Sequence, residues 1–303
     1  MALGYDGKLF ILAFDHRGSF KKMFGAGDDA TPAQFAQLQD AKRLVFDGFK
    51  AALELGVDRN AAGVLVDEEM GESVAREAKE LGLKLAMPVE KSGQPLFDFE
   101  YGADFGKHIE SFDADFSKVL VRWNPGDDPA DNREQGTRLK QLGDWLHANG
   151  RTFLFELLVP ATDADLAKVD GDKSRYDTEV RPDVTLGAIE EILAAGVEPD
   201  IWKIEGLDKR SDCERLSAVI RSGGRDGVVA VVLGRGADNA AVDHWLTQGA
   251  PVKGYAGFAI GRSIWTDGVN AWRDGSISRE EAAHRIGVNF KRFVDVYRAA
   301  ESE

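Results

Sequence analysis

Lys203 lies in the stretch PDIWKIEGLD (199–208), between the apolar residues Trp202 and Ile204. Lysine is among the residues least often fully buried, because the desolvation of its ammonium group is costly. A lysine inside an apolar strand is therefore either held in an ion pair or used for chemistry in its uncharged form. An uncharged lysine can attack a ketone to form an iminium ion, which accepts electrons when a carbon–carbon bond breaks.

Other charged residues lie in similar apolar runs, and their spacing groups them. Because side chains alternate along a strand, Lys203 and Glu205 share one face, as do Lys118 and Arg122 of SKVLVRW. A cation such as Lys118 would lower the pKa of Lys203, whereas Glu156 of RTFLFELLV would raise it and could instead shuttle protons. For a single residue a structural ion pair is an equal alternative, but the whole set at strand ends favours chemistry.

Two glycine–arginine loops near the end of the chain are typical of an anion site. Gly234, Arg235 and Gly236 follow one apolar run, and Gly261 and Arg262 follow the next. Glycines let backbone N–H groups approach an anion, and the start of a helix adds favourable partial charge. We therefore expect these loops to bind a phosphate, with Arg262 available for a bidentate contact.

The acidic run DEE (67–69) and His16 are the only candidates for a divalent metal, and their pattern is weak. Adjacent carboxylates on a strand cannot all face one point, so a solvated strand end is the favoured interpretation. No sequence pattern of a serine hydrolase or of a nucleotide-binding loop is present. We therefore predict an amine nucleophile, with no metal and no cofactor.

The overall composition limits the class of protein. The chain has 303 residues and a formal net charge of −14, which argues against nucleic acid or a membrane surface as a partner. The single cysteine, Cys213, excludes an internal disulfide and suits a reducing compartment. No leader peptide or long apolar segment is apparent, so we expect a cytoplasmic protein.

Short apolar runs alternate with longer amphipathic ones along the chain. The runs with strand character are 8–14, 61–67, 82–88, 117–123, 151–159, 200–205, 227–233 and 254–260. Helical patterns lie between most of them, for example 31–56, which begins with Thr31 as N-cap and Pro32 and stops at Gly56. A capped amphipathic helix is also predicted for 278–301.

Eight strands alternating with helices predict a single (β/α)8 barrel over residues 1–303, with the helix 278–301 packed on it. The alternative is an open doubly wound sheet, but the LAFDHRGSF stretch after the first strand lacks a glycine-rich dinucleotide turn. In a barrel, function gathers at the carboxyl ends of the strands, where Asp15, His16 and Arg17 also fall.

Several motifs occur in an order that resembles a known enzyme family. LAFDHRGSF, VLVDEEMG, PVEKSGQ, FLFELLVP, DIWKIEG and GFAIGRSIWTDGV, found over roughly residues 8–300, resemble the class I, Schiff-base aldolases that include tagatose-bisphosphate and sulfofructose-phosphate aldolases. The nearest resemblance is to the aldolase-like domain fused to bacterial 5-dehydro-2-deoxygluconokinase in inositol catabolism.

The resemblance implies a role for particular residues. It implies that Lys203 forms the Schiff base, that Glu156 acts in acid–base steps with Lys118 beside it, and that Asp15 is also catalytic. It implies phosphate binding at Gly261 and Arg262. The loop 234–236 and His16 depart from the tagatose enzymes, which have a serine-containing turn and a glutamine at these positions.

The implied reaction is cleavage of a ketose phosphate to dihydroxyacetone phosphate and an aldehyde. The leading substrate is 5-dehydro-2-deoxy-D-gluconate 6-phosphate, which would also yield malonate semialdehyde. A carboxylate substrate needs another cation, for which the candidates are Arg17, Lys91, Arg122, Arg175 and Arg181. The polar segment 160–182 could be a lid, but an exposed connection is favoured.

Other functions remain open at this point. Tagatose bisphosphate, sulfofructose phosphate or another ketose phosphate are alternative substrates. A metal-dependent lyase and a non-catalytic sugar-phosphate sensor are alternatives of other classes. The late aromatic residues Trp265, Trp272, Phe290, Phe293 and Tyr297 could support a homo-oligomer, although packing of the last helices onto the barrel explains them better.

Overall fold

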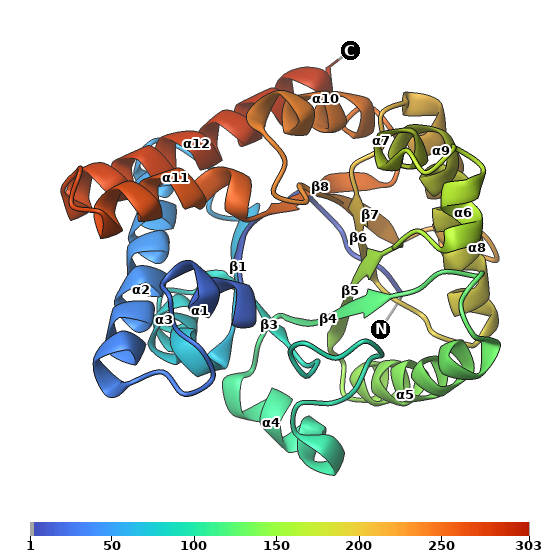
Figure 1. Cartoon of the computed structure of the whole chain (residues 1–303), viewed down its shortest axis with the longest axis horizontal. Coiled ribbons are helices and arrows are strands. Elements are labelled where there is room, and N and C mark those ends of the chain that lie inside the picture. The colour runs from blue at the N-terminus through green and yellow to red at the C-terminus, as the bar shows by residue number, and fades with distance from the viewer. Residues whose placement is uncertain (1–2, 303) are drawn as a thin grey trace.

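The computed structural model describes residues 3–302, and within them eight parallel strands close into a barrel in the order of the sequence. The strands are β1 (Leu9–Phe14), β2 (Ala62–Val66), β3 (Lys84–Pro88), β4 (Phe116–Arg122), β5 (Thr152–Leu158), β6 (Ile201–Glu205), β7 (Val229–Leu233) and β8 (Tyr255–Ile260). Each lies within two residues of its predicted run. The predicted (β/α)8 barrel is thus confirmed, and Figure 1 shows its helices surrounding the ring of strands.

The helices follow the strands in the alternating pattern that the sequence predicts. They are α1 (Gly18–Met23), α2 (Pro32–Glu54), α3 (Glu68–Glu80), η1 (Gly102–Asp104), α4 (Phe105–Phe112), α5 (Pro129–Ala148), α6 (Asp163–Ala167), α7 (Lys173–Arg175), the π-helix η2 (Tyr176–Val180), α8 (Arg181–Ala194), α9 (Arg210–Ile220), α10 (Asn239–Gly249), α11 (Arg262–Arg273) and α12 (Arg279–Ala300). Thr31 caps α2 in a capping box, and Ser278 caps α12 by accepting a hydrogen bond from the Glu281 amide. The short helices α1 and α4 were not predicted, because so few residues show no clear period.

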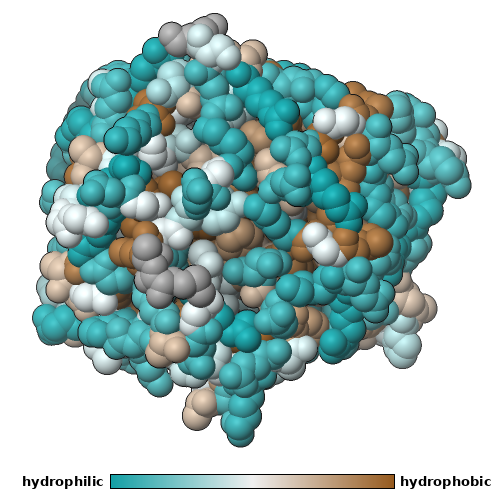
Figure 2. Space-filling model, turned by 180° about the vertical axis from the view of Figure 1, so that it is seen from behind, coloured by the Kyte–Doolittle hydropathy of each residue, from teal (hydrophilic) through white to brown (hydrophobic). Residues whose placement is uncertain are grey.

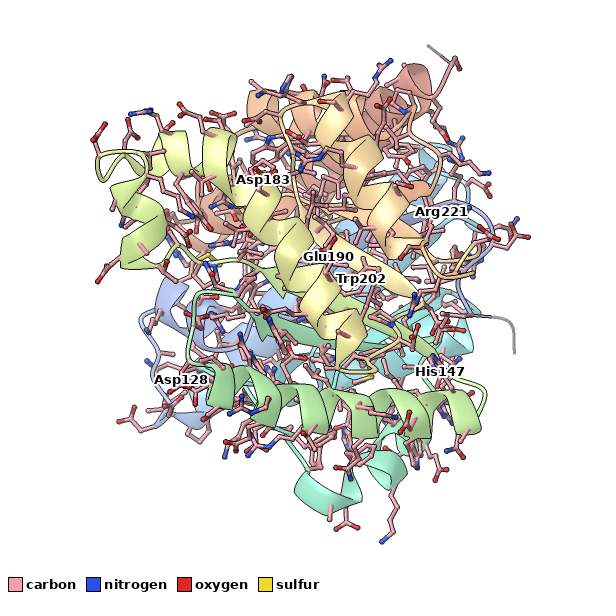
Figure 3. The ribbon with its side chains drawn as sticks, turned by 90° about the vertical axis from the view of Figure 1, so that its right-hand side faces the viewer. Asp128, His147, Asp183, Glu190, Trp202 and Arg221 are labelled. Carbon is pink, nitrogen blue, oxygen red and sulfur yellow. The ribbon has the colours of Figure 1, made fainter. Side chains whose placement is uncertain are left out.

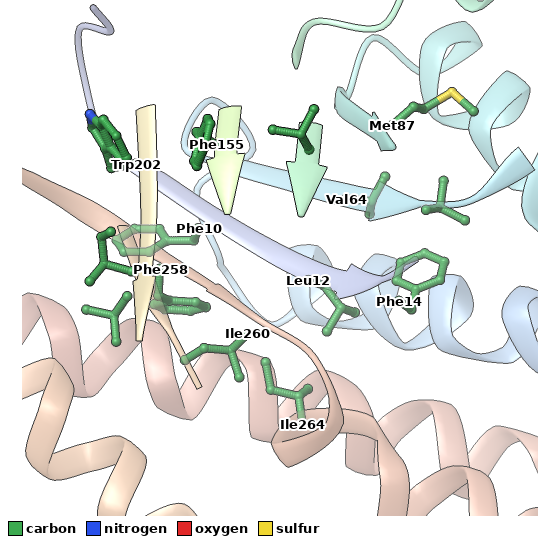
Figure 4. Packing of buried hydrophobic residues seen from close by; sticks show 14 of the residues in the cluster. Phe10, Leu12, Phe14, Val64, Met87, Phe155, Trp202, Phe258, Ile260 and Ile264 are labelled. Carbon is green, nitrogen blue, oxygen red and sulfur yellow. The ribbon is translucent and has the colours of Figure 1, made fainter. Parts of the chain in front are cut away.

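Apolar side chains on the strands separate into two layers. Phe10, Leu12 and Phe14 of β1 face outward, where they pack under the helices in a large cluster (Figure 4).

The outer helices cover the barrel. Next to β5 and β6 lie α5, which begins after Asp128 and carries His147 near its end, and α8, which carries Asp183 and Glu190 (Figure 3). The helix α12 lies against α2 and α11. The space-filling view from behind shows a mostly hydrophilic exterior with scattered apolar groups (Figure 2).

A second apolar cluster fills the inside of the barrel. It includes Ile11 of β1, Phe116 of β4, Leu154 of β5 and Ile201 of β6. The N-terminal segment closes this end of the barrel, because Tyr5 packs its ring on Phe116 with 5.7 Å between ring centroids. Since residues two apart share a face, the inward side of each of these strands continues toward its carboxyl end with charged residues.

The closure between β8 and β1 depends on one glycine. Gly257 pairs with Leu9 and has a φ of +151°, and a Cβ built on it would lie 2.0 Å from the Leu9 carbonyl oxygen. Gly257→Ala is therefore expected to lower the free energy of unfolding by about 2–4 kcal/mol, through steric overlap and an unfavourable backbone conformation. Urea unfolding measures this loss.

Gly275→Ala is a suitable control, because Gly275 also has a positive φ but has no atom within 4 Å of its built Cβ. Gly275→Ala should lower the free energy of unfolding by only about 1 kcal/mol, which is the cost of the unfavourable backbone conformation. Equal losses in the two variants would contradict the role assigned to close packing at Gly257.

No helix within residues 3–302 combines the length and the apolar character needed to cross a bilayer.

Candidate active site

Charged side chains from four strands meet inside the barrel at the carboxyl ends of the strands. Lys118, Glu156 and Lys203 lie on the inward faces of β4, β5 and β6, and Asp15 directly follows β1. Glu156 and Lys203 are direct partners in the register of β5 and β6, so that they occupy the same level of the barrel. The residues that were predicted to share strand faces are therefore brought together by the register of the barrel.

Lys203 lies beside a cavity and not only in an ion pair. Its side chain is 3% exposed, and its Nζ is 3.0 Å from Oε2 of Glu156. Both residues line a cavity of about 610 Å³ at the mouth of the barrel. A small ligand can thus reach the amine, which a purely structural ion pair would not require.

Lys118 is the centre of the charged cluster. Its Nζ donates to Oδ2 of Asp15 at 2.8 Å and to Oε1 of Glu90 at 2.9 Å, and it lies 3.0 Å from Oε2 of Glu156. Burial alone would lower the pKa of Lys118, but these three carboxylates outweigh it and hold the pKa well above its usual value. Lys118 is therefore a fixed positive charge and not a second nucleophile.

The three carboxyl groups around Lys118 differ in their acidity. Burial tends to raise the pKa of Asp15 and of Glu156, but Lys118 and Lys203 outweigh burial and lower both values. For Glu90, burial dominates and raises the pKa. The cluster thus contains two carboxylates that favour the ionised form and one carboxyl group that more readily holds a proton.

His16 also lines the cavity, and its backbone carbonyl is held by Lys42, a residue that the sequence analysis did not identify. Burial lowers the pKa of His16 to about 4, so the imidazole is neutral at pH 7. The buried Lys42 of α2 donates to the carbonyl oxygens of Phe14 and His16 and lies 2.5 Å from Oδ1 of Asp67. Lys42 therefore holds the end of β1 in place, although its position in an amphipathic helix gave no sign of this role.

The interpretation of the acidic run 67–69 as a solvated strand end is wrong for Asp67, whereas Glu69 is exposed. Asp67 is fully buried, pairs with Lys42 and caps α3 by accepting a hydrogen bond from the Met70 amide. Glu69 pairs instead with Lys21 of α1. Among residues 3–302 no group of three or more His, Cys, Asp or Glu side chains is arranged to hold a metal ion.

The two glycine–arginine loops form one side of the cavity. Gly236 has a φ of +73°, and a Cβ on it would lie 3.0 Å from the guanidinium of Arg262. Arg262 donates to the carbonyl of Arg235 at 3.1 Å and has no carboxylate within 4.0 Å in the described part of the chain. Gly261 directly precedes α11, so that its loop brings a helix N-terminus to the cavity.

Arg235 is held differently from Arg262. Its guanidinium lies 2.8 Å from Oε1 of Glu205 and 2.9 Å from Oδ1 of Asp177. Its charge is thus largely compensated, although the side chain still lines the cavity. Gly234 does not line the cavity and packs instead toward Ile260.

The segment 160–182 is folded into short helices, and most of its residues are exposed, as expected. It forms α6, α7 and η2, and the buried Tyr176 donates its hydroxyl to the Val159 carbonyl at 2.9 Å. Arg181 is buried and donates to the Gly206 carbonyl, while Arg175 is on the surface with Glu179. Neither arginine lines the cavity, so both fail as candidates for a substrate contact there.

The opposite rim carries the other candidate cations. Arg17 is held by Glu90, whose carbonyl oxygen is 2.8 Å from Nη2, and by Glu100. Lys91 and Arg122 also line the cavity, and neither has a carboxylate within 4.0 Å among residues 3–302. This rim therefore offers positive charge that no acidic side chain of the described chain compensates.

The structure gathers nearly all of the predicted site residues around one cavity. Those that line it are Asp15, His16, Arg17, Lys118, Arg122, Glu156, Lys203, Arg235, Gly236, Gly261 and Arg262. Gly234 and the candidate cations Arg175 and Arg181 do not line it, whereas the candidate cation Lys91 does. Glu90, Glu205 and Lys22 also line the cavity. Glu205 could be found from the sequence because it shares a strand face with Lys203, whereas Lys22 could not, because it lies in the unpredicted helix α1.

Comparison with known proteins identifies a family and a fold. The family model described as "Uncharacterized protein conserved in bacteria (DUF2090)" matches residues 5–301. No curated protein matches the chain.

Solved structures with a similar barrel share little sequence with this chain. A fructose-bisphosphate aldolase from Plasmodium falciparum has a TM-score of 0.67 at 13% identity, covering 96% of this chain and 91% of its own. Cgl0159 from Corynebacterium glutamicum has a TM-score of 0.56 at 18% identity, covering 96% and 88%. A Schiff base forming fructose-1,6-bisphosphate aldolase has a TM-score of 0.56 at 15% identity, covering 96% and 94%. At such identities the likeness shows the fold alone.

Proposed function

The chain belongs to the bacterial family DUF2090, and we propose that its barrel is a class I aldolase that cleaves a ketose phosphate through a Schiff base on Lys203. The observation that carries this proposal is a buried lysine amine that borders a cavity and lies 3.0 Å from a carboxylate. The likeness in fold to a Schiff base forming fructose-1,6-bisphosphate aldolase supports it.

The arrangement assigns a task to each charged group. The amine of Lys203 attacks the ketone, and Glu156, which contacts both lysines, moves protons as the carbinolamine loses water. The ionised Asp15 is suited to take the proton of the substrate hydroxyl whose carbon becomes the aldehyde. When the carbon–carbon bond breaks, its electron pair passes into the iminium and forms an enamine. Lys118 holds the carboxylates in place.

The order of strands suggests how a substrate lies. Arg262 follows β8 and Arg122 ends β4, so these two arginines come from opposite positions in the ring, and β6 with Lys203 lies midway between them. A substrate with an anionic group at each end can thus bind Arg262 with its phosphate and Arg122 with its other end. Its ketone would then lie near Lys203.

The leading substrate is 5-dehydro-2-deoxy-D-gluconate 6-phosphate, which carries a phosphate and a carboxylate at its two ends. Its products are dihydroxyacetone phosphate and malonate semialdehyde. Tagatose bisphosphate and sulfofructose phosphate are the alternatives, because each also has a second anionic end.

Borohydride reduction followed by mass mapping tests the mechanism. Reduction in the presence of dihydroxyacetone phosphate should leave one adduct on Lys203, and a strong chelator should not change the result. Absence of an adduct with every ketose phosphate of a panel would refute the proposal. Product analysis on the same panel, which contains the three substrates above, distinguishes among them.

Arg262→Ala is expected to weaken the binding of phosphorylated substrates by about 10–100-fold, because a charge-assisted contact contributes roughly 1.5–3 kcal/mol. The measurement is the apparent affinity for dihydroxyacetone phosphate. Arg215→Ala is the control, because Arg215 lies on the outer helix α9 and pairs with Asp183. An unchanged affinity in Arg262→Ala would refute the assignment of the phosphate site.

A further inference from the structure

Glu90 lies inside the charged cluster, although no step above uses it. It follows β3 in a hairpin, where it pairs with Phe99, and its backbone carbonyl accepts a hydrogen bond from Arg17 at 2.8 Å. Its side chain is buried, lines the cavity and accepts from Lys118 through Oε1 at 2.9 Å. Glu90 thus contacts Lys118 from the end of β3, whereas Glu156, the partner of Lys203, contacts Lys118 from β5.

The other oxygen of Glu90 has no partner. Oε2 is buried and accepts no hydrogen bond from any residue within 3–302. A buried, unpaired anionic oxygen costs much more free energy than a neutral hydroxyl in the same place. The surroundings of Glu90 therefore make it a better proton acceptor than an exposed carboxylate.

The balance of charge around the cavity points in the same direction. The groups that line the cavity and contact one another are the basic Arg17, Lys118 and Lys203 and the acidic Asp15, Glu90 and Glu156. Arg17 also contacts Glu100, which is more exposed and does not line the cavity. With the six lining groups ionised, their charges cancel. When Lys203 becomes neutral in order to attack a ketone, the cluster has one negative charge in excess, and a proton on one carboxyl group restores the balance.

Glu90 is the carboxyl group that can best hold this proton. The groups that face it are Lys118 from β4, Arg17 and Asp15 from the end of β1, and, beyond Arg17, Glu100 of its own hairpin. Burial raises the pKa of Glu90, whereas the two lysines lower the pKa of Asp15 and of Glu156.

We propose that Glu90 is the proton store of this site, which takes up the proton that Lys203 loses before its attack and returns it for the loss of water. The proposal rests on the proposed Schiff-base function. Its path is a chain of contacts: Lys203 to Glu156 at 3.0 Å, Glu156 to Lys118 at 3.0 Å, and Lys118 to Glu90 at 2.9 Å.

The transfer balances without any other reactant. The proton of Lys203 passes to Oε2 of Glu156, which passes a proton to Lys118 as Lys118 gives one to Glu90. One N–H bond breaks at Lys203 and one O–H bond forms at Glu90. The freed electron pair of the amine attacks the carbonyl carbon as the C=O π pair moves to the oxygen, which takes a second proton of the nitrogen and becomes the carbinolamine hydroxyl. The reverse transfer supplies the proton with which the carbinolamine hydroxyl leaves as water.

The test is the pH dependence of adduct formation with dihydroxyacetone phosphate, trapped by borohydride in wild type and in Glu90→Gln. Glutamine keeps the size and the contact with Lys118 but cannot store a proton. We expect at least about a tenfold slower adduct formation at pH 7 and a midpoint at least about one pH unit higher, with recovery at alkaline pH where hydroxide removes the proton. A purely structural defect would not recover with pH.

Glu100→Gln is the matched control, because Glu100 also contacts Arg17 but is more exposed and does not touch Lys118. Its pH profile should equal that of wild type. A wild-type profile in Glu90→Gln would overturn the proposal and leave the aldolase function intact, whereas an unlabelled wild type would refute the function itself.

If Glu90→Gln does not fold, Glu90→Asp decides the question. Aspartate can carry the proton but ends one methylene further from Lys118. The relay predicts about tenfold slower adduct formation at pH 7 with a midpoint near that of wild type. A wild-type rate in this variant would overturn the proposal.

Discussion

Lys203→Ala is expected to abolish the borohydride adduct and to lower turnover by about 10⁴-fold or more, because no other lysine of the cluster can replace the nucleophile. Lys118 is held as an ammonium by three carboxylates and cannot attack a carbonyl. The measurements are mass mapping after reduction and the initial rate of cleavage.

The variant should nevertheless fold. Glu156 keeps Lys118 as its partner when Lys203 is removed, so no buried carboxylate loses its only counter-ion. Lys253→Ala is the matched control, since Lys253 is exposed before β8 and far from the carboxyl ends of the strands. Full activity in a folded Lys203→Ala protein would exclude Schiff-base chemistry at this residue.

Lys118→Met is expected to destabilise the protein by about 3–5 kcal/mol, which is the usual cost of leaving a buried charge without its partner. Asp15, Glu90 and Glu156 would then lie together in the barrel without the ammonium that separates them. Urea unfolding of wild type and variant at several pH values measures the loss.

The pH dependence of this loss has a definite sign. Asp15 has a lowered pKa in the folded protein, so its contribution to stability is present above its unfolded value near 3.9 and is lost as the pH falls through the folded value. The difference between wild type and Lys118→Met should therefore be largest above about pH 5 and shrink in acid. A difference that does not depend on pH would show that lost packing, and not charge, destabilises the variant.

The site residues on strands were easier to predict than those in the loops and helices that follow the strands. Alternation along the strands predicted that Lys203 shares a face with Glu205 and Lys118 with Arg122, because a period of two is a local property of the chain. The tertiary structure turns these faces toward the cavity. Glu90 falls just after the predicted run 82–88, but nothing in the sequence shows that it contacts Lys118. No pattern in the sequence shows that Asp177 reaches Arg235, because the intervening helices decide where Asp177 lies.

The order of apolar runs, their lengths and the capping residues were enough to determine an eight-strand barrel with helices around it, since these signals depend on neighbours in the chain. The tertiary structure alone decided which charges meet. Lys118 contacts Asp15, which lies 103 positions away in the chain, and Glu90, which lies 28 positions away, because barrel closure and strand register place them at one level. These contacts also set the pKa of each group, because burial and neighbouring charges shift the pKa of a carboxyl group away from the value typical of its residue type.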